Sequence, residues 1–218
     1  AVEVGRTHAV AADVPECERG KPLLSVFRSP FERYVSQYRY GCWRKTPDMY
    51  CDPAPILDAY PHYPEVSFAE FVRIANRYFA RPLDGAERDG QALGWHTEQY
   101  LRFHARDAAA AYAALRAQTP SAERLEALEY PLHVLHAESG RLAEALAACM
   151  RRLGLPEAYA ERLHEVRPSS RRHLHEIALH RDAHTYYDRG LAEFVFERER
   201  WLFARFPAAV DRMMAACA

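Results

Sequence analysis

The fold of this chain is decided by the stretch Arg28-Ser29-Pro30-Phe31-Glu32-Arg33-Tyr34-Val35-Ser36-Gln37-Tyr38 and the apolar run before it. Residues 23–27, Leu-Leu-Ser-Val-Phe, are a short apolar segment between two prolines, as expected of a buried strand. Ser29 is a favourable N-cap, Pro30 suits the first helical position, and Glu32 has capping-box spacing with Ser29. The stretch therefore predicts a buried strand, a tight turn and a helix.

An anion site is expected where this strand passes into the helix. A helix N-terminus presents N–H groups and the positive end of the helix dipole, which favour an anion. Ser29, Arg33 and Ser36 are spaced i, i+4 and i+7, so they share one helical face. Arg28 and Ser36 could hold a phosphate by charge and by hydrogen bonding. Two structural alternatives stay open. Arg33 could simply support the helix, and Arg28 with Ser36 could be a helix-capping pair that makes a surface ion pair with Glu32.

The pattern Arg-x-Pro-x-x-Arg-x-x-Ser-x-Tyr over residues 28–38 resembles the 3′-phosphate-binding segment of sulfotransferases, which use 3′-phosphoadenosine 5′-phosphosulfate (PAPS). Its second arginine and its tyrosine are similar to the carbohydrate-sulfotransferase version. Upstream, Arg6-Thr7-His8 resembles the family's Lys-Thr-His element. Further resemblances extend the likeness over nearly the whole chain. They are to a family stretch near the acceptor side (residues 95–100), a strand and glutamate (134–138), a Gly-Leu-Pro element (154–156) and the last helix (186–206).

The resemblance implies an α/β fold, a P-loop-NTPase-like parallel sheet flanked by many helices, in a single domain over residues 1–218. It implies PAPS as co-substrate, no metal, and sulfuryl transfer to a hydroxyl acceptor, a small molecule or a glycan. His8 would be the base that takes the acceptor's proton, and Arg6 would stabilise charge on the leaving phosphate. Arg28, Ser36 and Arg33 would be the cofactor-binding residues.

One element of the family pattern is missing from the sequence. The family opens with a strand, a loop and a helix whose lysine and small hydroxyl residues hold the 5′-phosphosulfate. Gly5-Arg6-Thr7 lacks that lysine, and the chain has only two lysines, Lys21 and Lys45. The expected fold is therefore incomplete at its N-terminus. The alternative function is a non-catalytic relative that keeps the phosphate clamp for binding a nucleotide or a partner.

Composition excludes some classes of partner. The net charge of −1 provides no field that would attract nucleic acid or an anionic membrane. No stretch has the apolar length needed to span a bilayer, and the first residues do not resemble a signal peptide, so we expect a cytoplasmic protein. Cys42 and Cys51 could pair in an oxidising compartment but would be free thiols in the cytosol. The histidines at 173, 175, 180 and 184 have ligand-like spacing without acidic or thiol partners, so no metal site is predicted.

The remaining chain is expected to alternate helices with a second strand. We expect the first helix over residues 30–42, an irregular connection over 43–66 and a helix that begins at Ser67. Further helices are expected at 105–117, from 120, at 139–153 and at 185–206, with a strand at 131–136. The aromatic residues Tyr34, Tyr38, Tyr40 and Trp43 are expected in the core. Strands alternating with helices agree with an α/β sheet, and the 43–66 and 81–100 segments would shape the acceptor pocket.

Overall fold

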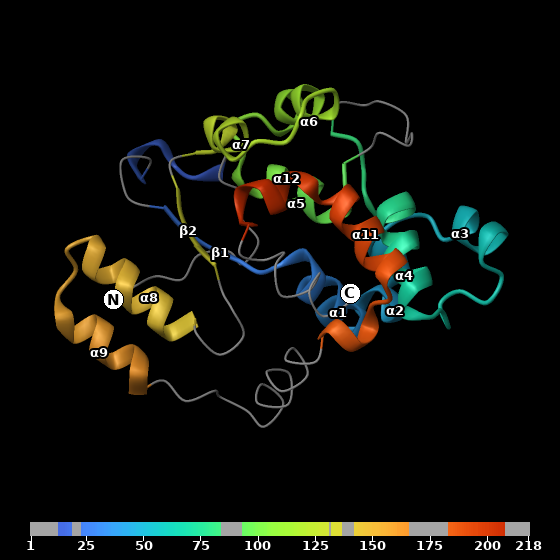
Figure 1. Cartoon of the computed structure of the whole chain (residues 1–218), viewed down its shortest axis with the longest axis horizontal. Helices are drawn as coiled ribbons and strands as arrows, with labels where there is room; N and C mark the ends of the chain where they lie inside the picture. Colours follow the sequence, from blue (N-terminus) through green and yellow to red (C-terminus); the bar gives the residue numbers. More distant parts are fainter. Residues whose placement is uncertain are drawn as a thin grey trace.

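The computed structural model describes residues 13–18, 23–83, 93–130, 132–136, 142–165 and 183–207. Helices dominate these residues and surround one pair of strands, β1 (Leu23–Phe27) and β2 (Leu132–His136) (Figure 1). The helices are α1 (Pro30–Tyr40), α2 (Cys42–Lys45), α3 (Ala54–Ala59), α4 (Phe68–Ile74), α5 (Trp95–His104), α6 (Ala108–Arg116), α7 (Ala122–Leu128), α8 (Leu142–Arg152), α9 (Glu157–Glu165), α11 (Arg189–Arg198) and α12 (Arg200–Arg205). Short 3-10 turns are η2 (Glu16–Glu18), η3 (Pro47–Met49) and η5 (Ala183–Tyr186), and the π-helical turn η4 (Ala75–Phe79) follows α4.

The two strands run parallel, in a register that places Leu23 opposite Leu132 and Phe27 opposite His136. Both predicted strands are thus confirmed, but the predicted burial of β1 is wrong on one of its faces. Phe27 is buried, whereas Leu24 and Val26 are 45% and 49% exposed, because successive side chains of a strand point to opposite faces. A helical protein with two parallel strands is what the described residues show, and the wider P-loop-like sheet stays a prediction.

The core lies between α1, α4, α5 and the C-terminal helices α11 and α12. It is rich in aromatic side chains, and Phe31, Tyr34, Trp43, Phe71 and Trp201 are all fully buried. The prediction of core aromatics is therefore confirmed for Tyr34 and Trp43, whereas Tyr40 is 57% exposed. Figure 1 shows α8 and α9 packed side by side, with α8 next to β2 and both away from this aromatic core.

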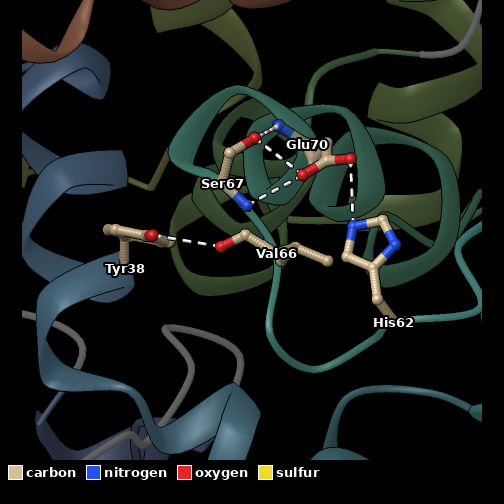
Figure 2. Close-up of polar contacts among 5 residues, drawn as sticks. All are labelled: Tyr38, His62, Val66, Ser67 and Glu70. Atoms are coloured by element: carbon tan, nitrogen blue, oxygen red, sulfur yellow. Dashed lines mark hydrogen bonds and ion pairs between the residues drawn. The ribbon is translucent and has the colours of Figure 1, made fainter.

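Helix α4 begins with a capping box, which confirms the predicted helix start (Figure 2). The Ser67 hydroxyl accepts from the Glu70 N–H at 3.3 Å, and the Glu70 carboxylate accepts from the Ser67 N–H at 2.8 Å. His62 Nε2 lies 3.1 Å from the other oxygen of Glu70. Tyr38 of α1 donates to the carbonyl of Val66 at 3.1 Å, so α1 is attached to the start of α4.

Three predictions of chain organisation need correction. The 43–66 connection, predicted to be irregular, contains α2, η3 and α3. Helix α5 was not predicted, and the single helix expected over 185–206 is broken into η5, α11 and α12. Cys42 and Cys51 are not joined by a disulfide bond. None of the helices in the described ranges has both the length and the apolar character needed to cross a bilayer.

Candidate anion-binding site

The predicted strand–turn–helix unit is present in the backbone. Arg28 and Ser29 connect β1 to α1, which begins at Pro30. The carbonyl of Ser29 accepts the first helical bond, from the Arg33 N–H at 2.9 Å. Gly41 ends the helix in the left-handed region, with φ 68°, a conformation that glycine adopts without a Cβ penalty. The helix start therefore lies directly at the carboxyl end of β1, where the sequence predicted an anion site.

The structure brings together the two residues predicted to form the clamp. Arg28 Nη1 donates to Ser36 Oγ over 3.4 Å, the long end of the hydrogen-bond range. Both side chains are partly buried; Arg28 lies just before α1 and Ser36 lies within it. A guanidinium and a hydroxyl this close can donate together to the oxygens of one phosphate group.

The predicted capping box of α1 is wrong. Ser29 occupies the N-cap position, but its side chain makes no cap hydrogen bond. Its backbone, at φ −47° and ψ 135°, lies outside the extended region that N-cap residues usually adopt. The hydroxyl of Ser29 is buried and has no hydrogen-bond partner among the residues that the structure describes. The Ser29 side chain therefore leaves the first N–H groups of α1 uncapped, beside an arginine.

Arg33 extends from α1 to α5. Its Nη2 donates to Gln99 Oε1 at 2.8 Å. Burial lowers the pKa of Arg33, an effect that the negative charge of Glu199 opposes. The structure therefore attaches Arg33 to the protein interior, whereas it pairs Arg28 with Ser36.

A buried carboxylate that the sequence did not indicate, Glu199, joins α1 to α5. Glu199 accepts from Tyr34 Oη at 2.7 Å, from the backbone N–H of His96 at 3.0 Å, and from the N–H and hydroxyl of Thr97 at 2.8 and 2.7 Å. It thus caps the N-terminus of α5, where the helix dipole favours negative charge. A Cβ at Gly94 would collide with this carboxylate. The sequence shows Glu199 only as one of several charges in the run 197–200.

Two histidines of α5 are held in the neutral form. Burial, and secondly the charge of Arg33, lower the pKa of His96 well below its usual value. Burial lowers the pKa of His104 to about 4. His104 Nδ1 lies 3.0 Å from the carbonyl of Tyr100, and Nε2 lies 2.7 Å from Ser25 Oγ. Because a carbonyl can only accept, Nδ1 carries the hydrogen, and the Ser25 hydroxyl donates to Nε2.

The other predicted site residues lie outside the described residues. These are Arg6 and His8. Glu138 of the strand-and-glutamate resemblance, which is not a predicted site residue, also lies outside them. Of the ligand-like histidines, His184 alone falls in a described segment, in η5. No group of three or more histidine, cysteine or acidic side chains within the described ranges could hold a metal ion.

Comparisons with protein-family models, with curated proteins and with solved structures found no match for this chain.

Proposed function

We propose that this protein is a PAPS-dependent sulfotransferase that transfers a sulfuryl group to a hydroxyl acceptor, with carbohydrates as the preferred acceptor class. The observation that carries the proposal is the contact between Arg28 and Ser36 near the start of α1, which the Ser29 side chain does not cap. These two residues hold the two defining positions of the 3′-phosphate segment that the sequence resembles. The P-loop-like α/β sheet of that family belongs to the same proposal.

The clamp would bind the 3′-phosphate of the cofactor. Arg28 supplies charge-assisted hydrogen bonds, which are the strongest contacts available to a phosphate. Ser36 supplies a hydroxyl donor, and the first turn of α1 supplies N–H groups and the positive end of its dipole. Such a site would distinguish a 3′-phosphorylated nucleotide from one that lacks this phosphate.

The transfer itself is a displacement at sulfur. The acceptor's hydroxyl oxygen forms a bond to sulfur as the bond from sulfur to the bridging oxygen of the 5′-phosphate breaks. His8 would take the proton of the hydroxyl, and Arg6 would stabilise the charge that develops on the leaving phosphate. The products are a sulfate ester and 3′,5′-diphosphoadenosine. Arg6 cannot supply a proton to the leaving group, because a guanidinium stays protonated.

A second function is favoured by the missing lysine at Gly5-Arg6-Thr7. A relative without the 5′-phosphosulfate loop would keep the 3′-phosphate clamp and serve in nucleotide or partner binding. Such a protein would bind 3′,5′-diphosphoadenosine without turnover.

A transfer assay separates the two functions. The chain is incubated with PAPS and a panel of oligosaccharide and small hydroxyl acceptors, and the release of 3′,5′-diphosphoadenosine is measured. A sulfotransferase releases it only when an acceptor is present, and His8→Ala lowers kcat by about 10²–10⁴-fold with nucleotide affinity unchanged. Nucleotide binding without turnover supports the non-catalytic relative, and the absence of both contradicts both functions.

A further inference from the structure

We infer that helix α5 positions the Arg28 clamp through two side-chain hydrogen bonds, from Ser25 to His104 and from Arg33 to Gln99. The inference rests on the proposed function, since the ligand of the clamp is taken to be a 3′-phosphate. Ser25 lies before Arg28 on β1 and Arg33 lies after it on α1, so both flanks of the arginine are attached to one helix.

The bond before Arg28 joins β1 to the C-terminal end of α5. Ser25 Oγ and His104 Nε2 are 2.7 Å apart and partly buried, and the Tyr100 carbonyl fixes the tautomer of the imidazole. The Ser25 hydroxyl therefore has a defined acceptor, and the strand cannot shift along α5 without losing it. A shift of β1 would move Arg28, which directly follows its last residue, Phe27.

The bond after Arg28 joins α1 to the middle of α5. Arg33 Nη2 donates to Gln99 Oε1 at 2.8 Å in a partly buried position. A buried guanidinium needs its donors satisfied, because an unpaired buried charge is costly. The bond to Gln99 therefore ties α1 to α5 at this point. This geometry favours a positioning role for Arg33 over direct contact with the ligand.

Helix α5 is itself fixed at its other end. Glu199 accepts the N–H groups of His96 and Thr97 at the first turn of α5, and Asn76 Oδ1 accepts the Trp95 N–H at 3.2 Å. Asn76 also donates to Tyr34 Oη on α1 at 2.8 Å. Helix α5 is thus held at its N-terminus by Glu199 and Asn76 and bonded to both flanks of Arg28. Small displacements of a clamping group are expected to weaken its contact with the phosphate.

The test compares binding of 3′,5′-diphosphoadenosine and 5′-AMP by calorimetry in full-chain variants. His104→Leu and Gln99→Leu each remove one acceptor, and we expect each to lower the preference for the 3′-phosphorylated nucleotide about three- to tenfold, the range of one net hydrogen bond. Affinity for 5′-AMP should stay unchanged. His104→Gln places a side-chain acceptor near the position of the imidazole Nε2. It should therefore keep most of the wild-type preference for the 3′-phosphorylated nucleotide.

Two further variants separate positioning from general destabilisation. Asp107 caps α6 by accepting from the Ala110 N–H, at a point away from Ser25 and Arg33. Asp107→Ala should therefore lower the stability of the protein but keep the wild-type preference for the 3′-phosphorylated nucleotide. Ser25→Ala removes the hydroxyl that donates to His104 and should lower the preference as His104→Leu does. It provides the same test if His104→Leu does not fold.

A wild type that binds the two nucleotides equally well contradicts the proposed function itself. A wild type that discriminates, with unchanged preference in Ser25→Ala and Gln99→Leu, overturns this inference alone.

Discussion

Glu199 binds both the backbone N–H and the hydroxyl of Thr97, at 2.8 and 2.7 Å, in a fully buried position. Tyr34 of α1 donates to the same carboxylate at 2.7 Å. Three segments distant in sequence, α1, the start of α5 and the junction of α11 with α12, therefore meet at one charged group. A buried carboxylate is tolerated only when its oxygens are hydrogen-bonded, so this junction fixes the position of α5.

We predict that Glu199→Ala lowers the free energy of unfolding by about 3 kcal/mol or more, because it leaves several buried donors without an acceptor. Urea unfolding measures the loss. The matched control is Glu197→Ala, whose side chain is 71% exposed, and it should change stability by less than about 0.5 kcal/mol. A loss below about 1 kcal/mol for Glu199→Ala would mean that the carboxylate is not the centre of this junction.

Two glycines should respond to alanine in opposite directions. A Cβ at Gly94 would overlap the Glu199 carboxylate, so Gly94→Ala should destabilise the protein by about 1–3 kcal/mol. At Gly190, in α11, the nearest atom to an added Cβ would be 3.6 Å away, an ordinary contact. Gly190→Ala should therefore be neutral or stabilise by up to about 1 kcal/mol. Thermal unfolding of the two variants shows whether each substitution raises or lowers stability. Equal changes in stability would refute the packing described at Gly94.

The two serines at helix starts should differ in their contribution to stability. Ser67 accepts from the Glu70 N–H and donates its own N–H to the Glu70 carboxylate. Ser67→Ala should therefore lower the free energy of unfolding by about 1 kcal/mol. Ser29 makes no cap bond and its buried hydroxyl has no partner within the described residues. Ser29→Ala should therefore cost less than about 0.5 kcal/mol in the absence of ligand, since no hydrogen bond is lost. Equal losses in urea unfolding would show that Ser29 does cap α1.

His104 should make the stability of the protein depend on pH. Its pKa is about 4 in the folded state and about 6.5 in the unfolded state. Between these values the unfolded state binds the proton first, so stability falls as pH falls from 6.5 towards 4, by up to about 1.4 kcal/mol per pH unit. Urea unfolding at pH 7, 5.5 and 4.5 should show a shallower fall for His104→Gln than for the wild type. Parallel curves would contradict the burial of the imidazole.

The sequence predicted the strand–turn–helix unit because its signals are local. An apolar run ends at Phe27 and Pro30 starts the helix. The predicted end at residue 42 was two residues too late, because α1 ends at Tyr40 before Gly41. The exposure of Leu24 and Val26 was not predictable in this way, since it depends on which face of β1 packs against the protein.

Helix α5 was missed for a related reason. Its N-cap is Gly94, which makes no side-chain bond, and the group that satisfies its first N–H groups is Glu199, about one hundred residues later. The same glutamate lies at the break between α11 and α12, which the sequence pattern showed as one continuous helix. For the site, Arg28 and Ser36 could be placed together because both belong to one local strand–turn–helix unit. The bonds of Arg33 and Ser25 to α5 instead join segments far apart in the chain.

The measurement that tests the central claim most directly is the affinity of the full chain for 3′,5′-diphosphoadenosine and for 5′-AMP. The Arg28–Ser36 clamp predicts tighter binding of the 3′-phosphorylated nucleotide. Arg28→Ala should reduce that preference by about tenfold or more, because a charge-assisted hydrogen bond contributes roughly 1.5–3 kcal/mol. Arg39→Ala, which removes an exposed arginine at the other end of α1, should leave the preference unchanged. Equal affinity of the wild type for the two nucleotides would contradict the assignment of this site to a 3′-phosphate.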